Sequence, residues 1–292
     1  MGRHVVALLR AGGHDVLGVD SLDERVHPEP RTSKSAANEL AVDLYLNTPQ
    51  TFLDECDAVI HLAAQVSVAD SADDPLRYIE QNSADTAEFL QRCPPKRLIV
   101  ASSMSVYGEG GVRVTEQNPV CPTSVYGLTK YDQERLCLIW GQRHGIPVTA
   151  LRFFNIFGPG QALTNPYTGV LANFASAMLN DRAPTIFEDG LQTRDFIHVS
   201  DVAGAVVAAL TESSGGVFNV CTGQATTILE AAQLLRDALG KEHLALKVTG
   251  TTRPGDIRHC TGDPSKAEND LGFVSQVSFA QGITEYAMAL QP

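Results

Sequence analysis

The sequence lacks paired cysteines. Six cysteines lie at positions 56, 93, 121, 137, 221 and 260, and no two of them form a C-x-x-C pair. Scattered single cysteines are typical of proteins in a reducing cytoplasm, and they indicate neither a zinc site nor a disulfide framework. We therefore expect a cytoplasmic protein that binds no metal.

Long apolar runs and an excess of basic residues are also missing. No stretch is long enough to span a bilayer, and no charged leader with a following apolar run opens the chain, so we expect neither a membrane protein nor a secretory signal. Lys and Arg number 22 against 34 Asp and Glu, a formal net charge of −12. This balance argues against nucleic acid or an anionic membrane surface as a partner. An anionic ligand stays compatible with it, because a single site can be locally positive.

Short apolar runs alternate with helical patterns over the first half of the chain. The expected strands cover residues 14–20, 58–64, 97–103 and 147–154, and the expected helices cover residues 5–9, 75–92 and 124–144. Apolar runs without polar alternation are typical of strands buried on both faces, as in parallel sheets. Strand and helix in alternation indicate an α/β protein with a doubly wound parallel sheet of the Rossmann type.

The pattern changes from about Asn155. The run FGPGQALTNPYTG is rich in Gly, Pro, Asn and Thr and predicts a long loop, after which helices and short strands mix without a regular order. We expect a dinucleotide-binding domain over residues 1–154 and a smaller substrate-binding α/β cap over residues 155–292. Residues 193–212, approximately, are expected to pack back on the first domain.

The beginning of the sequence departs from this fold class, which should open on a strand and a glycine-rich turn. The chain instead runs from Met1 through Gly2 directly into a helical stretch, so the first strand and most of the turn are missing from it. Gly2 fits the last glycine of a G-x-x-G-x-x-G turn, and Asp20 lies 18 positions beyond it. That distance is close to the ~20 residues that separate the turn from the acidic ribose ligand. The carboxylate of Asp20 would repel the 2′-phosphate of NADP, which favours NAD as the cofactor. An upstream start, a truncation and a degenerate relative with weak cofactor binding are all compatible with this beginning.

A candidate catalytic group follows the third expected strand. Tyr126 and Lys130 are four residues apart within an expected helix, so their side chains share one face. A lysine ammonium near a phenol stabilises the phenolate and lowers its pKa, which makes tyrosine a usable general acid or base. Ser103 ends the strand RLIVASS and could hold the substrate oxygen. Each feature alone is weak, but their order along the chain is specific.

In this combination the chain resembles the extended short-chain dehydrogenase/reductase superfamily and, within it, the nucleotide-sugar epimerase/dehydratase family. The resemblance covers essentially the whole chain apart from the missing start. It implies a catalytic trio, an NAD site and a site for a nucleotide-diphosphate sugar linked to dTDP or UDP. The implied catalytic residues are Ser103, Tyr126 and Lys130; the cofactor-binding residues are Gly2, Asp20, Asp43, Leu62, Ala63, Ala64, Tyr126 and Lys130; and the substrate-binding residues are Ser103, Ser105, Asn155, Arg194 and Arg253.

Structural roles are open for some of these residues. Arg194 could form a surface ion pair with Asp195, and Arg253 precedes Pro254 and Gly255 and could be a turn residue. The functional interpretation is that a diphosphate favours planar guanidinium groups with several donors. His61 is expected to be structural rather than catalytic.

The two residues after Ser103 indicate the type of reaction. The 4,6-dehydratases of the resembled family carry an Asp-Glu pair there, and this sequence has Met104 and Ser105. The missing acid pair argues against dehydration. The later runs resemble most the group of dTDP-L-rhamnose 4-epimerases, which implies inversion at C4 of a dTDP-6-deoxyhexose through a transient 4-keto sugar.

Three alternatives stay open at this point. A reductase or dehydrogenase of NDP-4-ketosugars would consume or produce the nicotinamide cofactor stoichiometrically, and another nucleotide-sugar lyase would use the same scaffold. A truncated, non-catalytic nucleotide-sugar-binding paralogue is the third. Relatives of this kind are commonly homodimers, so a homodimer is expected, while Leu136, Leu138, Ile139 and Trp140 are expected to be mostly core residues.

Overall fold

The computed structural model describes residues 1–21, 39–41, 56–92, 95–163, 169–212, 215–252 and 257–291. The helical elements are α1 (Gly2–Ala11), α3 (Val68–Asp73), α4 (Pro75–Tyr78), the π-helical η1 (Ile79–Ala84), α5 (Asp85–Arg92), the 3₁₀ turn η2 (Met104–Tyr107), α6 (Val125–His144), α7 (Val170–Leu179), α8 (Val199–Ala209), α9 (Ile228–Ala238), α10 (Ser265–Leu271) and α11 (Phe279–Leu290). The strands are β1 (Gly18–Asp20), β2 (Glu39–Ala41), β3 (Val59–His61), β4 (Leu98–Ser103), β5 (Gly111–Val114), β6 (Val148–Phe153), β7 (Asn155–Phe157), β8 (Thr185–Ile186), β9 (Thr193–Arg194), β10 (Phe196–His198), β11 (Gly216–Val220), β12 (Thr226–Thr227), β13 (Lys247–Val248) and β14 (His259–Gly262).

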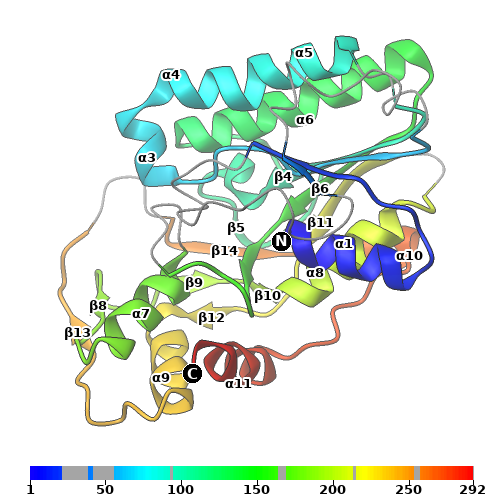
Figure 1. Ribbon diagram of the computed structural model, residues 1–292. Coiled ribbons are helices and arrows are strands. Elements are labelled where there is room, and N and C mark those ends of the chain that lie inside the picture. The colour runs from blue at the N-terminus through cyan, green and yellow to red at the C-terminus, as the bar shows by residue number, and fades with distance from the viewer. Residues whose placement is uncertain are drawn as a thin grey trace.

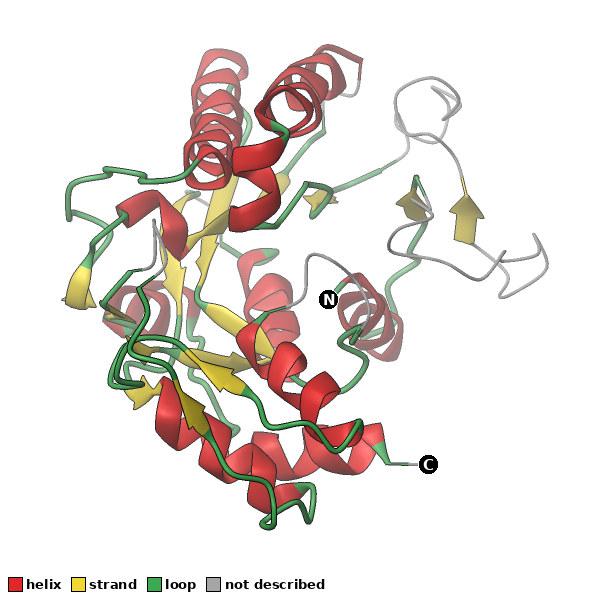
Figure 2. Ribbon diagram, turned by 90° about the vertical axis from the view of Figure 1, so that its left-hand side faces the viewer, coloured by secondary structure: helices red, strands yellow, loops and turns green. Residues whose placement is uncertain are grey.

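A four-stranded parallel sheet in the order β11-β6-β4-β3 forms the centre of the first half of the molecule. Helices cover both of its faces, as Figures 1 and 2 show. The helices α5 and α6 lie on one face, and α1, α8 and α10 lie on the other. The predicted α/β fold with a doubly wound parallel sheet is therefore confirmed.

The alternation of side chains along β4 accounts for the two covered faces. Leu98 and Val100 pack in the cluster that includes Cys137 of α6, and Ile99 and Ala101 pack in the cluster that includes Val5 of α1. Because successive residues of a strand point to opposite faces, a strand covered on both sides must be apolar throughout. This is the physical reason why the run LIVAS lacks the polar alternation of a half-exposed strand.

Helix α6 begins and ends where its sequence predicts. The Ser124 hydroxyl accepts a hydrogen bond from the Gly127 N–H at 3.0 Å, which caps the first turn. At the other end Gly145 adopts the left-handed conformation, with φ of 69°, that a residue with a side chain rarely adopts. Three of the four apolar residues near its end, Leu136, Leu138 and Trp140, are partly buried against the sheet, whereas Ile139 is 56% exposed.

Two early strands are shorter than predicted. The run 14–20 forms a strand only over β1, which pairs in parallel with β2, and the run 58–64 forms a strand only over β3, which pairs with β4. Within the described residues, β1 and β3 form no ladder with each other. A strand ends where its backbone finds no neighbour to pair with, so local pattern overestimates the length of such strands.

The second half of the chain contributes short strands and, among its described residues, the helices α7 to α11. The strands β12, β9, β14 and β5 form a second four-stranded sheet, and α7, α9 and α11 share one apolar core. Two later segments lie against the central sheet: β11 pairs with β6, and α10 packs on β11. Helix α8 packs against α1. The domain boundary at 154/155 stays a prediction, and the chain crosses between the two halves more than once.

Candidate active site

Ser103 and Tyr126 meet at the carboxyl end of β4. Ser103 is the last residue of this strand and is 7% exposed, and Tyr126 lies in the first turn of α6. Their side chains are hydrogen-bonded to each other. The Ser103 hydroxyl also accepts a hydrogen bond from the Ser105 N–H at 3.1 Å, which starts η2. The catalytic roles that the sequence suggests for these two hydroxyls stay a prediction.

The start of α6 is fixed from the neighbouring helix α3. The Tyr126 N–H donates to the Ser71 hydroxyl at 3.1 Å, and that hydroxyl donates to the Val68 carbonyl at 2.7 Å. Ser71 is fully buried. The first turn of α6, and with it the tyrosine ring, is therefore held by a side chain from a separate element.

The pKa of Tyr126 is raised above its ordinary value. Burial disfavours the phenolate, and the hydrogen bond with Ser103 offsets this only in part. The sequence predicted the opposite direction from the proximity of Lys130. The difference arises because burial is the dominant effect on the pKa of Tyr126.

Lys130 is buried, with 2% of its surface exposed, and its ammonium donates a hydrogen bond to the Gln133 side-chain carbonyl. Burial lowers the pKa of Lys130 to about 7, although Cys137 and Glu134 act in the opposite direction. A lysine with a pKa near neutrality can change its charge in the physiological range. Such a group in a site with a partly buried tyrosine is typical of proton handling.

A buried ion pair lies behind this site. Glu134 accepts two hydrogen bonds from the Arg152 guanidinium, at 2.9 and 2.6 Å, and a third from the Ser102 hydroxyl at 2.7 Å. Arg152 also donates to the Tyr107 hydroxyl at 2.8 Å. Burial acts to lower the pKa of Arg152, but its bonds to Glu134 raise it overall. The network ties the end of β4 to α6 and β6, and so fixes the backbone beside Ser103.

The residues expected to bind NAD lie at the ends of early elements. Gly2 starts α1, and a Cβ atom added to it would meet nothing within 4 Å. Asp20 is the last residue of β1, and Ala63 and Ala64 follow β3 with Leu62. Small residues and a carboxylate at strand ends fit the backbone approach and ribose contacts that a dinucleotide needs. Asp43 lies outside the described residues.

The residues expected to bind the substrate come from both halves of the chain. Asn155 opens β7 and donates from its side chain to the Asp195 carbonyl at 3.2 Å. Arg194, in β9, donates to the Thr193 carbonyl at 2.9 Å. Ser105 is 8% exposed within η2. Arg253 lies outside the described residues, so the structure gives no geometry for it.

Asp195 has a structural position rather than the surface ion pair considered from the sequence. It is fully buried, and its carboxylate accepts from the Thr222 N–H and hydroxyl at 2.9 and 2.7 Å and from the Gly223 N–H at 2.9 Å. A fourth bond, at 3.3 Å, comes from the Gly262 N–H. The carboxylate joins β9, β14 and the end of β11 beside Arg194.

Sequence reasoning missed the polar residues around Lys130. Gln133, Thr86 and Asn82 are fully buried and hydrogen-bonded, and none of them was a candidate. The signal was available in the spacing, because Gln133 stands three residues after Lys130 and therefore on the same helix face. From the sequence alone, a polar residue at that position would be assigned to the solvent-exposed surface. Only the packing of α5 on α6 shows that this position is buried.

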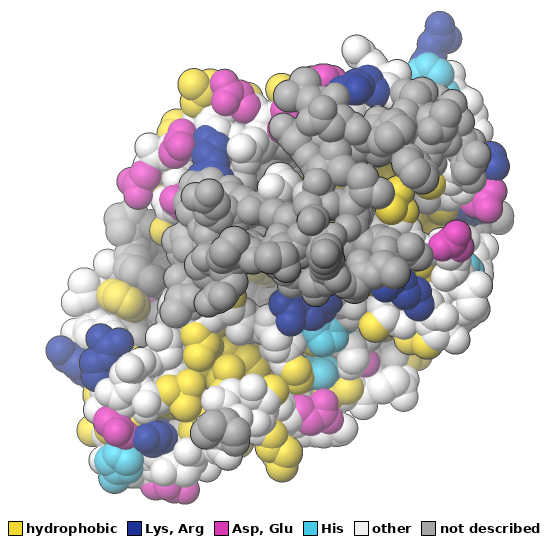
Figure 3. Space-filling model, in the orientation of Figure 1, with side chains coloured by type: hydrophobic (Ala, Val, Ile, Leu, Met, Phe, Trp, Pro, Cys, Tyr) yellow, Lys and Arg dark blue, Asp and Glu magenta, His cyan; other side chains and the backbone are white. Residues whose placement is uncertain are grey.

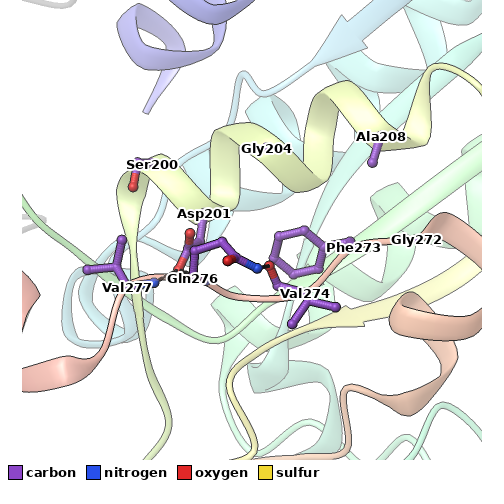
Figure 4. A pocket seen from close by; sticks show the side chains of 9 residues that line it. All are labelled: Ser200, Asp201, Gly204, Ala208, Gly272, Phe273, Val274, Gln276 and Val277. Carbon is purple, nitrogen blue, oxygen red and sulfur yellow. Dashed lines mark hydrogen bonds between the residues drawn. The ribbon is translucent and has the colours of Figure 1, made fainter.

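A groove elsewhere on the surface runs beside α8. Asp201 accepts hydrogen bonds there from the backbone N–H groups of Gln276 at 3.1 Å and Val277 at 3.0 Å, and Figure 4 shows these residues with Phe273 alongside the helix. None of the predicted site residues lines it. The lining residues are Ser200, Asp201, Gly204, Ala208, Gly272, Phe273, Val274, Gln276 and Val277.

One face of the molecule can be followed for its charge outside the residues drawn in grey. Acidic and basic side chains are interspersed on the face drawn in Figure 3. In the part of the chain that the structure describes, no helix combines the length and the apolar character needed to cross a membrane.

Comparison with known proteins identifies the family that shares this arrangement. A family model described as "NAD dependent epimerase/dehydratase family" matches residues 1–221. The dTDP-L-rhamnose 4-epimerase of Burkholderia thailandensis is 31% identical over 268 residues, which are 78% of this chain and 73% of the relative.

Solved structures of similar proteins agree over nearly the whole chain. The UDP-N-acetylglucosamine 4-epimerase of Methanobrevibacter ruminantium, in complex with UDP-N-acetylmuramic acid, has a TM-score of 0.88 and 31% identity, and the match covers 99% of this chain and 94% of that one. The UDP-glucose 4-epimerase of Thermus thermophilus, in complex with NAD, has a TM-score of 0.85 and 29% identity, with 99% and 95% covered.

Proposed function

Because the chain belongs to the NAD-dependent epimerase/dehydratase family, we propose that it is a nucleotide-sugar 4-epimerase that inverts C4 of a dTDP-linked 6-deoxyhexose. The observation that carries this proposal is the hydrogen-bonded pair of Ser103 and Tyr126 with the buried Lys130 one turn further along α6. Met104 and Ser105 follow Ser103. Without an acidic pair at these positions, C4 redox chemistry is favoured over loss of water.

Each side chain has a defined task in this reaction. Ser103 holds the oxygen of the sugar 4-hydroxyl, and Tyr126 takes its proton. NAD, when bound, supplies the hydride acceptor and donor at C4. The 4-keto sugar then presents its other face while its diphosphate stays with Arg194 and Arg253. Tyr126 returns the proton, so the configuration at C4 is inverted with no net oxidation.

Charge at the site explains why binding and proton transfer are coupled. Burial favours the protonated form of Tyr126, so a positive charge beside it is needed to stabilise the phenolate, the form that accepts the proton of the sugar 4-hydroxyl. Lys130 would supply one such charge, and NAD, when bound, would supply a second through its nicotinamide ring. Loss of either charge raises the pKa of the tyrosine further.

The preference for dTDP over UDP rests on the relative from Burkholderia thailandensis and on the resemblance of the later sequence runs. The test is to incubate the protein with NAD and, separately, dTDP-L-rhamnose, UDP-glucose and UDP-N-acetylglucosamine, and to follow C4 by proton NMR. Inversion in the dTDP arm supports the full proposal, and inversion only in a UDP arm overturns the nucleotide assignment. Net accumulation of NADH identifies a dehydrogenase. If calorimetry detects no NAD binding and no sugar turns over, the epimerase proposal is overturned, and calorimetric binding of a nucleotide sugar would then identify a non-catalytic binding protein.

We also propose a homodimer that forms through α6 and its neighbours. Leu128 and Ile139 of α6 are 45% and 56% exposed, and Leu76 of α4 and Ile79 of η1 are 63% and 47% exposed. The elements lie side by side, since the Ser83 hydroxyl of η1 donates to Asp132 of α6 at 3.3 Å. Large apolar side chains exposed on adjacent helices are typical of subunit interfaces.

A cytoplasmic location completes the proposal. Among the described residues, Cys121, Cys137, Cys221 and Cys260 carry free thiols, as expected for a protein in a reducing compartment.

A further inference from the structure

Gln133 lies between Lys130 and the chain that follows β3. It is fully buried one turn after Lys130 on α6, and its side-chain oxygen accepts the hydrogen bond from the Lys130 ammonium. Its Nε2 lies 3.2 Å from the Ala63 carbonyl, 2.9 Å from the Thr86 hydroxyl and 2.9 Å from His61 Nε2. One amide therefore contacts the lysine, the loop after β3 and two buried side chains of the adjacent elements.

The orientation of this amide is fixed at both ends. The Lys130 ammonium can only donate a hydrogen bond, and the Ala63 carbonyl can only accept one. Turning the amide round would place its NH₂ group against the ammonium and its oxygen against the carbonyl. Two buried groups would then lose their partners at once, which is the costly situation for polar groups in a protein interior.

The groups behind Gln133 are themselves held in place. The Thr86 hydroxyl donates to the Asn82 carbonyl at 2.7 Å, and His61 stacks on Phe89 with 5.2 Å between ring centroids. Burial, with the nearby Lys130 charge, lowers the pKa of His61 to about 3. The imidazole is neutral at physiological pH and adds no second positive charge beside the lysine.

We propose that Gln133 is a positioning residue that keeps the Lys130 ammonium charged and fastened to the loop 61–64. The inference rests on the proposed function for the task of Lys130, and it adds a residue to the proton-handling machinery. Because Ala63 belongs to the loop expected to contact NAD, Gln133 also links that loop to the lysine. A shift of this loop when the cofactor binds would displace the Gln133 amide and so change its hydrogen bond with the Lys130 ammonium.

In the described part of the chain, the other ionisable groups around Lys130 do not stabilise its ammonium through a direct hydrogen bond. Cys137 of the same helix is buried, and burial raises the pKa of its thiol to about 12, so it is uncharged. Glu134 acts on the lysine from a distance but is bonded to Arg152 and Ser102. Tyr126 on α6 and His61 on β3 are both neutral. The direct partner that the structure gives the ammonium is the Gln133 oxygen.

The test uses two substitutions that should shift the pKa of Lys130 in opposite directions. Gln133→Met has similar length and no acceptor oxygen, so the buried ammonium loses its bond and the pKa of Lys130 should fall by about one pH unit. Gln133→Glu places a carboxylate at the same distance, so the pKa should rise by about one pH unit or more. The pKa is read by NMR on the full chain with ¹³C-labelled lysine and no sugar present, and Lys130→Arg identifies the signal.

Leu138→Ala is the matched control, because it removes partly buried apolar surface from the same helix without touching the lysine. It should leave the titration of Lys130 unchanged. The inference is overturned if wild type, Gln133→Met and Gln133→Glu show the same titration of Lys130. It is also overturned if Gln133→Met, Gln133→Glu and Leu138→Ala all shift the pKa of Lys130 in the same direction. If Gln133→Met does not fold, the rise expected for Gln133→Glu decides alone.

The pH profile of turnover gives the second reading. The fall in turnover at alkaline pH that depends on Lys130 should shift to lower pH in Gln133→Met and to higher pH in Gln133→Glu. Loss of structure alone would instead reduce turnover equally at all pH values. Failure of the proposed function has a different signature. Wild-type protein would then turn over no nucleotide sugar while the NMR titrations still moved in opposite directions.

Discussion

At the scale of single residues, Tyr126 balances two opposing effects. Burial holds its proton in place, and the hydrogen bond with Ser103 partly offsets that effect. A tyrosine in such a position exchanges a proton only when a cation adjoins it. In the proposed reaction, its hydroxyl is therefore the group on which proton transfer depends most directly.

Replacing Tyr126 by Phe should lower kcat by about a thousandfold, within the range measured for loss of a general acid or base. Binding of the nucleotide sugar should persist, because the diphosphate contacts lie elsewhere. The two effects are separated by NMR turnover assays and by calorimetry. Tyr131→Phe, five residues further along the same helix, should keep wild-type turnover. Full activity of Tyr126→Phe would remove the hydroxyl from its role.

Lys130 gives a prediction about stability and pH. Its pKa is about 7 in the folded protein against an ordinary 10.5, so the unfolded chain binds more protons between these values. The free energy of unfolding contributed by this residue therefore rises as the pH increases from about 7 to about 10.5, and burial of the charge is unfavourable below pH 7. Relative to Lys130→Met, wild type should be least stable at acidic pH and should recover toward pH 9. Urea unfolding of both proteins across this range measures the difference, and parallel curves would contradict the assignment.

The sequence alone suggests which residues are candidates for catalysis, but it does not predict the protonation states of their side chains. Ser103, Tyr126 and Lys130 follow from a strand end and a helical spacing, which are local properties. The raised pKa of Tyr126 and the partner of Lys130 depend on how deeply α6 is buried and on what α5 places opposite it. Gln133 was missed for this reason, since the helix face that carries it is covered only in the folded molecule.

At the scale of elements, Asp195 connects strands that are remote in sequence. Its carboxylate bonds three backbone N–H groups and one hydroxyl from two other segments. Asp195→Ala should lower the free energy of unfolding by about 3 kcal/mol or more, because several buried donors lose one shared acceptor. Chemical denaturation measures the loss. Asp57→Ala, which removes an exposed partner of Lys96, should stay close to wild type.

The start of α1 allows a separate test of cofactor binding. Nothing in the described structure lies within 4 Å of a Cβ atom added to Gly2, so Gly2→Ala should not destabilise the fold. If the helix end approaches a pyrophosphate, the methyl group should weaken NAD binding about tenfold, or 1.4 kcal/mol. Calorimetry with NAD measures the effect. Gly204 of α8 is equally open, and Gly204→Ala should bind NAD as wild type does. Equal affinities for all three proteins would exclude Gly2 from the site.

The lengths of elements could be predicted where their signals are local. Ser124 and Gly145 set the ends of α6, and both can be read from the sequence. The strands β1 and β3 were predicted too long, because the extent of a strand depends on its neighbour across the sheet.

At the scale of the whole molecule, the exposed apolar residues of α6 bear on assembly. Ile139→Glu should convert the proposed dimer to a monomer, because a carboxylate placed in an apolar interface loses its hydration without gaining a partner. Light scattering coupled to gel filtration gives the mass. Val112→Glu changes a residue of β5 that is 68% exposed and should leave the mass unaltered. A monomeric wild-type protein would contradict the proposal outright.

The parallel sheet and its two covered faces could be foreseen from the apolar runs, whereas the mixing of the two halves could not. Nothing in the run GVFNV itself selects β6 as its partner. That choice is made by the edge that β6 leaves open and by the core that Phe218 fills between them. Such long-range selection is beyond any local pattern.

The pairing of β11 with β6 has a consequence for how the chain is made. On a ribosome, β6 emerges more than sixty residues before β11, since Thr149 pairs with Gly216. Until then the N–H and C=O groups along one edge of the central sheet are unpaired, and a strand of another chain could pair with them. At 5–20 residues per second, roughly 3–13 seconds pass before the natural partner arrives. Chaperone binding during translation should therefore peak after β6 emerges and decline once residue 220 is free of the exit tunnel.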